Sequence, residues 1–381
     1  MLATSWPLWV ESPDFPRVPF VAGLPDPSRS ASWVAFGLLV AAVAGGVAWR
    51  PALASGAVVL AALVAQDQHR LQPWAYQYFL VSIALAACPA GEASGLSRLF
   101  VVALYVHSGL SKLDASFVHG LGAEFLAVAT RPFGLHPRAW PDWVRTAATL
   151  AMPAAESGIG VGLCSRRTRR PALVGAIGMH LALLFVLGPA GLDHSANVLI
   201  WNGALIVEDV ILFGPTPAPS PTSGRFRASG LARLAMMGAA ILPFGERLGL
   251  WDAWPSFALY ASHVDLSDVY INEDEAGSLP ESLRRQLAAD GAWRRLDLTA
   301  WSRSVRGVPV YPQARACNGL AEALAARYRG ARALRVVRWG RAGWLSGRRD
   351  RDEAIGLDAI RRLGDRDRLN AHPAGAFLRR P

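Results

Sequence analysis

The chain has 381 residues, of which 52% are hydrophobic and 18% are charged, with a mean hydropathy of +0.24 and a formal net charge of +10. A soluble domain usually carries about 25% charged residues, so this composition favours a membrane protein, with a soluble protein that has a large buried core as the alternative. The hydrophobic residues gather in several charge-free runs close to the ~17–25 residues of a membrane-spanning helix. There are too many of these runs for a signal peptide.

The first segment, residues 1–31, is rich in Pro, Trp and Ser, and we interpret it as an irregular or interfacial segment with Trp6 and Trp9 at headgroup level. Residues 32–250 carry the apolar runs and predict an all-α polytopic membrane helical bundle of about eight spans. The expected spans are 32–49, 52–66, 74–90, 97–113, 144–164, 172–188, 196–213 and 230–249. Residues 115–141 are expected to lie in the membrane interface.

The loop between the fifth and sixth spans is unusually basic, and the positive-inside rule places it in the cytoplasm. It contains Arg166, Arg167, Arg169 and Arg170. Counting spans outward from this loop puts Arg50, Arg98, Arg225 and Arg227 on the same side. The part of the chain after residue 250 is then expected on the extracytoplasmic side.

The character of the chain changes after residue 250, beyond a Pro/Ser linker, GPTPAPSPTSG, between the last two spans. Residues 251–345 predict a small α+β domain. We expect strands within 263–275, 293–301 and 333–339 and helices within 279–290 and 317–328. Residues 346–381 are interpreted as a charged, loosely ordered tail. The arginines of this region fit the anionic headgroups of a lipid bilayer, and we expect no nucleic-acid partner.

The cysteines and histidines argue against two kinds of site. Cys88, Cys164 and Cys317 are isolated and form no CxxC motif, so a membrane thiol oxidoreductase, which needs two thiols that can meet, is not expected. The eight histidines show no metal-ligand spacing such as HExxH, and we expect no metal site.

Lys112 is the only lysine among the 39 basic residues, and it ends an apolar run. Tyr105 and Ser108 precede it by seven and four residues, which places all three on one face of a helix. A snorkelling cation could equally be an arginine, which this chain uses everywhere else. Arginine cannot lose its proton, whereas a desolvated lysine can. We therefore interpret Lys112 as an amine that acts as a base, with snorkelling as the alternative.

Other polar residues fall inside the expected spans, where an ionisable group is a functional hypothesis by default. Glu156 lies in the middle of the fifth span among small residues, and His180 in the middle of the sixth. A further stripe in the seventh span consists of His194, Asn197, Trp201 and Glu208. The alternatives are a hydrogen-bonded core histidine for His180, and a solvated position at the inner end of the span for Glu208 and Asp209.

The segment YVHSGLSKLDASFVHGLGAEFL resembles the region around the active-site lysine of vitamin K-dependent gamma-glutamyl carboxylase and of bacterial membrane proteins with a horizontally transferred transmembrane (HTTM) domain. The family's pattern is filled by Tyr105, Ser108, Gly109, Lys112, Leu113, Asp114 and Phe117, and its catalytic base falls on Lys112. A second segment resembles the family through Asp67, Tyr76 and Tyr78. A third has a histidine-led span, with His180, followed by an asparagine-led one, with Asn197.

The resemblance implies a pocket in a helical bundle that takes a quinone-like molecule, with Lys112 at its outer rim, in a multi-pass protein of the bacterial plasma (inner) membrane. It also implies that the C-terminal domain is extracytoplasmic. One departure argues against glutamate carboxylation, because Pro73 and Trp74 stand where the carboxylase has an Asn-His pair. The C-terminal domain is also shorter than that of the carboxylase and shares no motif with it.

Three functions remain open at this point. The first is a membrane enzyme that acts on a quinol or another lipid-soluble substrate, with Lys112 as general base and with Tyr105, Asp114 or Glu156 orienting it. The second is a non-catalytic module for assembly or transport, similar to proteins of the DoxX type, in which Glu156 and His180 join helices. The third is a proton-coupled carrier with Glu156, Glu208 and Lys112 as a relay, for which no inverted repeat is visible.

Overall fold

The structure, a computed structural model, describes residues 1–215, 229–328 and 334–378. Most of the predicted Pro/Ser linker, together with Arg225 and Arg227, lies outside these residues.

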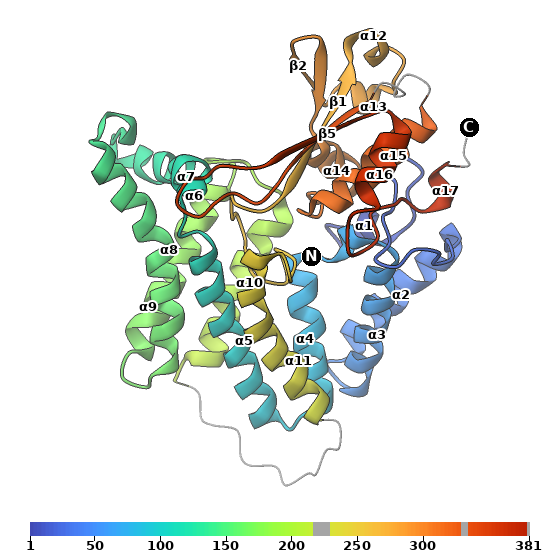
Figure 1. Ribbon diagram of the computed structural model, residues 1–381. Helices are drawn as coiled ribbons and strands as arrows, with labels where there is room; N and C mark the ends of the chain where they lie inside the picture. Colours follow the sequence, from blue (N-terminus) through green and yellow to red (C-terminus); the bar gives the residue numbers. More distant parts are fainter. Residues whose placement is uncertain (216–228, 329–333, 379–381) are drawn as a thin grey trace.

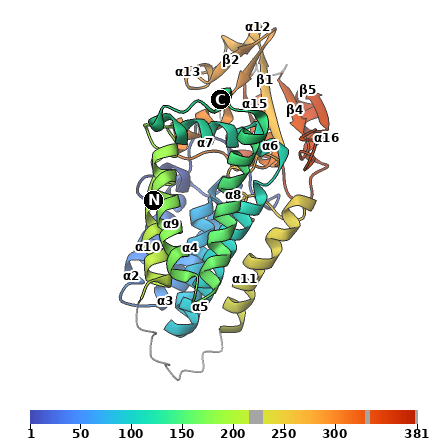
Figure 2. The ribbon, with the colours of Figure 1, turned by 90° about the vertical axis from the view of Figure 1, so that its left-hand side faces the viewer.

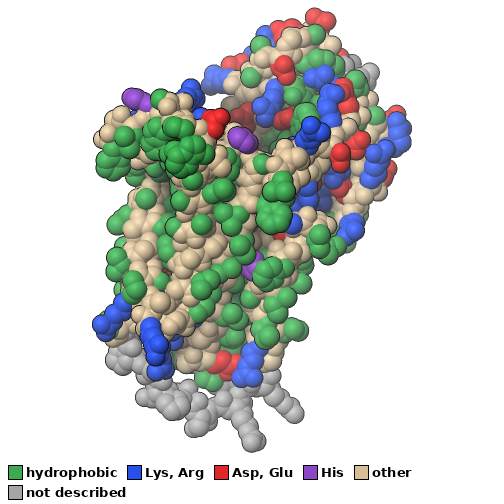
Figure 3. Space-filling model, turned by 60° about the vertical axis from the view of Figure 1, so that its left-hand side comes forward, with side chains coloured by type: hydrophobic (Ala, Val, Ile, Leu, Met, Phe, Trp, Pro, Cys, Tyr) green, Lys and Arg blue, Asp and Glu red, His purple; other side chains and the backbone are tan. Residues whose placement is uncertain are grey.

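Among the described residues, four helices are long and apolar enough to cross a membrane, and they stand side by side in one bundle (Figures 1 and 2). They are α5 (Ala90–Ser111), α8 (Asp142–Cys164), α9 (Arg169–Leu187) and α10 (Ala196–Phe213). Hydrophobic side chains also cover their outer faces, for example Val161 on α8, Val174 on α9 and Val207 on α10, each more than half exposed. In Figure 3 charged side chains gather at the two ends of the molecule, with a mainly uncharged band between them.

The prediction of about eight spans is too high, because the other four apolar helices are short. They are α2 (Arg29–Gly45), α3 (Pro51–Gln66), α4 (Pro73–Ala87) and α11 (Ser229–Ile241), with 17, 16, 15 and 13 residues. At 1.5 Å per residue they reach about 20–26 Å, less than the ~30 Å hydrocarbon core. Prolines at the starts of α3 and α4 begin each of these helices abruptly after a turn.

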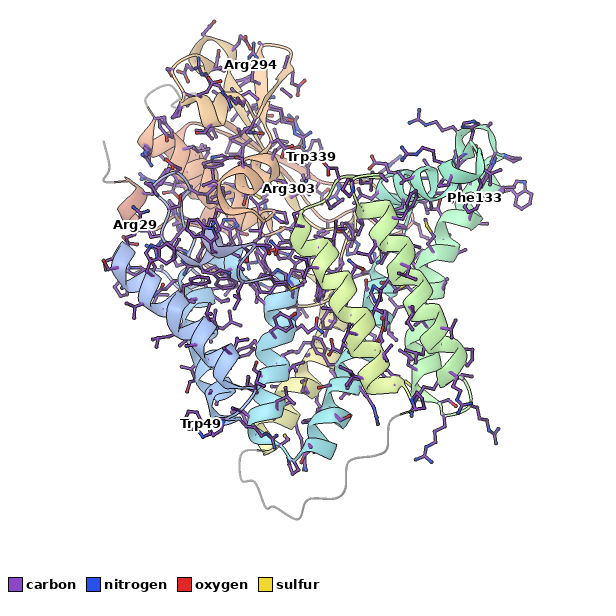
Figure 4. The ribbon with its side chains drawn as sticks, turned by 180° about the vertical axis from the view of Figure 1, so that it is seen from behind. Arg29, Trp49, Phe133, Arg294, Arg303 and Trp339 are labelled. Carbon is purple, nitrogen blue, oxygen red and sulfur yellow. The ribbon has the colours of Figure 1, made fainter. Side chains whose placement is uncertain are left out.

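The expected interfacial segment 115–141 forms short helices at the end of the bundle near the C-terminal domain (Figure 1). They are α6 (Ala115–His119), α7 (Leu121–Thr130) and the 3₁₀ turns η2 (Arg131–Phe133) and η3 (Pro137–Ala139). Phe133 is 77% exposed and points away from the molecule, as Figure 4 shows. An exposed aromatic ring in these short helices and turns is compatible with a position in the membrane interface.

The C-terminal part forms a five-stranded antiparallel sheet with strand order β2-β3-β1-β4-β5. The strands are β1 (Leu266–Asn272), β2 (Leu287–Asp290), β3 (Trp293–Leu296), β4 (Arg335–Trp339) and β5 (Arg351–Ile355). The helices are α12 (Glu273–Ala276), α13 (Glu281–Arg284), α14 (Leu298–Arg306), α15 (Ala314–Arg327), α16 (Leu357–Gly364) and α17 (Gly375–Leu378). The core lies between the sheet and α15, where Val269, Ile271, Leu320, Leu324 and Val336 are buried. The α+β prediction is confirmed.

Two segments of this domain differ from the sequence prediction. The predicted helix 279–290 contains only the four residues of α13, and Leu287 then pairs with Leu296 of β3. Residues 346–381 are not a separate tail, because β5 pairs with β4, with Val336 opposite Ala354. β5 is a short strand at the edge of the sheet, and it is rich in charged residues. Charges at a sheet edge prevent pairing with other chains, but they also remove the apolar alternation by which a strand is recognised in a sequence.

The N-terminal segment does not lie at headgroup level as a whole. In α1 (Trp6–Trp9) Trp9 is completely buried, while Trp6 is 44% exposed. Phe15 and Val18 belong to the hydrophobic core of the C-terminal domain. The segment therefore joins the bundle to that domain, a long-range packing that its irregular composition does not reveal.

A buried ion pair reinforces this junction. Asp67 follows α3 and is completely buried, and its carboxylate accepts a hydrogen bond from Arg306 at the end of α14, 2.5 Å away. The same carboxylate caps the 3₁₀ turn η1 (Gln68–Arg70) through the backbone N–H of His69. Arg70 donates to the backbone carbonyls of Leu8 and Trp9, and these hydrogen bonds connect the junction to the N-terminal segment.

A histidine clamp forms a second junction between the bundle and the C-terminal domain. His263 lies 3.0 Å from Asp114 through Nδ1 and 2.8 Å from Glu246 through Nε2. Asp114 also accepts from Arg247, and Glu246 from Arg341. Burial alone would lower the pKa of His263, but the hydrogen bonds to the two carboxylates raise it above its ordinary value.

We expect the clamp to make stability depend on pH. A raised folded-state pKa means that protonated His263 contributes stability fully below its unfolded value of 6.5, and that this contribution is lost as pH rises through the folded value. The His263→Gln substitution should therefore lower the melting temperature, relative to the native protein, by more at about pH 6 than at about pH 9. Equal losses at the two pH values, measured in thermal unfolding scans, would show that the histidine is not clamped as a cation.

Candidate functional site

A cavity of about 1020 Å³ lies between the membrane bundle and the C-terminal domain. Six of the eight predicted site residues line it: Tyr105, Ser108, Lys112, Glu156, His180 and Asn197. Most of the other bundle residues around it are apolar and include Leu104, Phe125, Met152, Leu183 and Val198. The cavity is large enough for a lipid-soluble molecule of drug-like size.

Lys112 stands at the end of α5 and forms a buried ion pair with Glu156 of α8. The distance from Lys112 Nζ to Glu156 Oε2 is 2.7 Å, and the two side chains are 9% and 12% exposed. Ser108, one turn earlier on α5, accepts a hydrogen bond from Lys112 at 3.0 Å. All three residues line the cavity.

Glycines bring α5 and α8 close enough for this pair to form. A Cβ atom on Gly109 would lie 2.4 Å from the backbone carbonyl of Pro153, and one on Gly160 would lie 2.9 Å from Cβ of Tyr105. The Ser-Gly pair before Lys112 and the small residues after Glu156 thus have a packing role.

Deeper in the bundle, Tyr105 and His180 form the centre of a second polar cluster. The Tyr105 hydroxyl donates to the Asp209 carboxylate at 2.5 Å and lies 2.7 Å from Nε2 of His180. His180 Nδ1 lies 2.9 Å from Oδ1 of Asn202, whose amide nitrogen donates to the carbonyl of Val198. Because Asn202 presents its oxygen, His180 Nδ1 must carry a proton.

That constraint gives the cluster two proton arrangements. When Tyr105 donates to Asp209, Nε2 of His180 carries a second proton, and the ring is a cation facing a carboxylate. When Tyr105 donates to His180, the ring is neutral and Asp209 must hold the proton. One proton can therefore move between His180 and Asp209 through the Tyr105 hydroxyl.

Three residues of the seventh-span stripe, Asn197, Trp201 and Glu208, are hydrogen-bonded to side chains from other parts of the chain. Asn197 accepts a hydrogen bond from Thr4, and Trp201 donates to Gln77 of α4 at 2.6 Å. The amide of Gln77 in turn donates to Glu208. Glu208 is therefore bonded inside the bundle and is not simply a solvated end of the helix.

Two predicted supporting residues lie away from the cavity. Asp67 holds Arg306 at the first junction, and Asp114 caps α6 and holds His263 at the second. Asp114 stands next to Lys112 in the sequence, but the turn between α5 and α6 directs its carboxylate toward the C-terminal domain. Neither carboxylate lines the cavity, and neither contacts Lys112.

Sequence reasoning missed Asn202 and did not place Asp209 in the seventh-span stripe. The buried row on α10 contains Asn202, Leu205, Asp209 and Leu212, one position beyond the stripe inferred from the sequence. Asn202 and Asp209 are seven positions apart and so lie about 20° from one another around the helix, whereas Asp209 lies about 120° from Asn197. The i, i+7 spacing of Asn202 and Asp209 was therefore a usable signal, but the position of its face could not be read from the sequence.

Among the described residues no group of three or more His, Cys, Asp or Glu side chains could hold a metal ion. Within the same part of the chain Cys88, Cys164 and Cys317 are free thiols, and Cys317 lines the cavity. The chemistry that the site can offer from its own residues is proton transfer, through Lys112 with Glu156 and through Tyr105 with its two partners.

No family model matches the chain, and neither a curated protein nor a solved structure matches it.

Proposed function

We propose that the protein binds a lipid-soluble substrate in the cavity and that Lys112 removes a proton from it. The observation that carries the proposal is that a buried lysine, unique in the chain, lines a large and mainly apolar cavity beside a carboxylate. A quinol or quinone is the substrate class that the resemblance to the gamma-carboxylase and HTTM proteins implies, and it remains a prediction.

Glu156 supplies the step that a paired lysine needs before it can act as a base. The Lys112 ammonium first passes a proton across 2.7 Å to the Glu156 carboxylate, which leaves a neutral amine and a neutral acid. A ligand that displaces water favours this neutral pair, because separated charges are costly in an apolar site. The amine then takes the substrate's proton, and the ammonium so formed lies beside the substrate anion.

The orientation is part of the proposal: the C-terminal domain is extracytoplasmic in a bacterial plasma membrane. Its support is that the loop between α8 and α9, which contains Arg166 and Arg167, and the first turn of α9, which contains Arg169 and Arg170, lie at the end of the bundle opposite that domain (Figure 1). Reporter fusions at residues 168 and 260 test it, since identical signals would refute it.

The leading alternative is a non-catalytic membrane module of the DoxX type. It is favoured by one observation, namely that Lys112, Glu156, Tyr105 and His180 all have partners within the protein. In that case these contacts serve only to join helices. The proton-coupled carrier gains support only from the Tyr105 cluster, which could pass a proton but is not connected to Lys112 by a hydrogen bond among the described residues.

We expect an organic extract of the purified protein to contain about one lipid-soluble molecule per chain. The Ala155→Trp variant should lose it, because Ala155 lines the cavity and an indole ring there would fill the space. The matched control is Ala154→Trp, since Ala154 is also exposed on α8 but does not line the cavity. Mass spectrometry measures the amount of this molecule in extracts of the native protein and of the two variants. Equal amounts in Ala155→Trp and Ala154→Trp would contradict the proposal.

A further inference from the structure

The loop between β4 and β5, residues 340–350, carries two large hydrophobic side chains that point into the surroundings of the protein. Leu345 is 91% exposed, and its neighbour Trp344 is 60% exposed. Figure 1 shows that this loop extends from the sheet to the end of the bundle beside α6. Exposed apolar side chains that gather at one place on a surface mark a contact with a membrane or with another molecule.

Hydrogen bonds place the tip of this loop beside the end of a membrane-spanning helix. The backbone N–H of Ala115 donates to the carbonyl of Trp344 at 3.0 Å, and the Trp344 indole donates to the carbonyl of Leu113. The span α5 ends only two residues before Leu113. Leu110, in the last turn of α5, is exposed and does not line the cavity, so it faces the lipid. Trp344 therefore lies at the depth where indole rings are enriched, between hydrocarbon and headgroups.

A second exposed segment lies next to the loop. It is the 3₁₀ helix η4 (Leu242–Leu248), which follows α11 directly and exposes Phe244 and Leu248. The guanidinium of Arg247 on η4 lies 5.5 Å from the centre of the Trp344 ring, so the two segments are neighbours although they are about 100 positions apart in the sequence. The loop tip thus continues the apolar surface of the helices beside it.

The polar side chains of the loop suit lipid headgroups. The loop contains three arginines, Arg341, Arg348 and Arg349, and one acidic residue, Asp350. Arg341 is paired with Glu246, whereas Arg348 is exposed and forms no ion pair within the described part of the chain. An exposed arginine three residues after an inserted leucine can reach a headgroup phosphate. A protein partner at this place would have to lie among the headgroups, which makes lipid the occupant that the geometry favours.

We propose that the tip of the β4–β5 loop inserts into the membrane interface and anchors the C-terminal domain to the lipid surface. This inference rests on the membrane position of the long helices and not on the proposed function. The loop also supports part of the cavity wall, because Arg349 donates to the carbonyl of Val264 at 2.8 Å and to that of Ser262, and both residues line the cavity. The lipid contact therefore holds in place a loop to which the cavity wall is bonded.

The test uses a nitroxide spin label at position 345 of the full-length protein in phospholipid vesicles. Leu345→Cys carries the label in a chain in which the exposed Cys164 is replaced by serine, while Cys88 and Cys317 are buried. Power-saturation electron paramagnetic resonance measures how accessible the label is to oxygen, which concentrates in lipid, and to a nickel chelate, which stays in water.

We expect the ratio of oxygen to nickel accessibility to be severalfold higher at Leu345→Cys than at Ala289→Cys. Ala289 is an exposed residue of the same domain on β2, which Figure 1 shows at the end of the domain far from the bundle. Leu345 makes few contacts within the protein, so neither substitution should disturb folding. Equal ratios at the two positions would show that the tip stands in water and would overturn the proposal.

A third label separates failure of the proposal from failure of the membrane assignment. Leu181 is exposed near the middle of α9 and does not line the cavity, so Leu181→Cys should give the highest ratio of the three. If Leu181→Cys resembles Ala289→Cys, the helices do not lie in the bilayer and the basis of the proposal is lost. If Leu181→Cys reports lipid while Leu345→Cys is shielded from both reagents, a protein surface covers the tip and the lipid contact is wrong.

Discussion

Replacing Lys112 by arginine is expected to reduce turnover of the bound substrate by about 10²–10⁴-fold, the usual contribution of a general base. Arginine can keep the ion pair with Glu156, but it cannot transfer its proton to the carboxylate. The variant should therefore insert, fold and bind the ligand while losing the reaction. The readout is turnover of the compound found in the organic extract, or rescue of a deletion strain.

Two comparisons make this result specific. Lys112→Ala should lose the reaction to the same extent and should also be less stable by about 3–5 kcal/mol, because it leaves Glu156 buried without its partner. The double variant Lys112→Ala with Glu156→Ala should recover part of that stability. A fully active Lys112→Arg protein would show that proton transfer by the amine is unnecessary, and the non-catalytic module would then replace the enzyme.

Replacing Asp67 by asparagine is expected to lower the free energy of unfolding by about 3–5 kcal/mol, because it leaves the buried Arg306 without its counter-charge. Burial alone would raise the pKa of Asp67, but the combined electrostatic effect of Arg306, His69 and Arg70, with the hydrogen bond from Arg306, outweighs it and lowers the pKa to about 2. The contribution of ionised Asp67 to the free energy of unfolding is therefore complete above its ordinary pKa of 3.8 and is lost as the pH falls toward 2.

In the Asp67→Asn variant, the loss of stability should appear first as separation of the C-terminal domain from the bundle. Limited proteolysis of the purified protein in detergent reports this directly, alongside thermal unfolding. Asp67→Asn combined with Arg306→Met should be milder than Asp67→Asn alone, since neither charge is then buried. Glu281→Gln, which breaks an exposed ion pair, is the control and should leave the pattern unchanged. A double variant as unstable as the single one would contradict the ion-pair explanation.

The sequence predicts the parts of the fold that depend on long apolar runs. The expected spans 144–164, 172–188 and 196–213 agree closely with α8, α9 and α10, because a run of this length has few other stable structures. The short helices beside them have the same composition but not the length. The edge strand β5 and the packed N-terminal segment depend on contacts with distant parts of the chain, which no local pattern displays.

The sequence likewise predicts some residues of the candidate site, while others are recognised only in the structure. Lys112 and Glu156 stand out because an ionisable residue inside an apolar run is rare and needs a partner. Asp114 stands out equally in the sequence, yet the turn after α5 directs it to His263 instead. Arg303 gives no signal among 38 arginines, and only the folded chain shows that it lines the cavity.

The most direct measurement of the central claim uses the single lysine as a spectroscopic label. Protein grown with lysine labelled with ¹³C at Cε gives one side-chain resonance, from Lys112. Adding back the organic extract to delipidated native protein should shift this resonance, and the same addition to Ala155→Trp should not. An unshifted resonance in the native protein, at ligand concentrations that saturate binding, would show that Lys112 does not meet the ligand and would contradict the account.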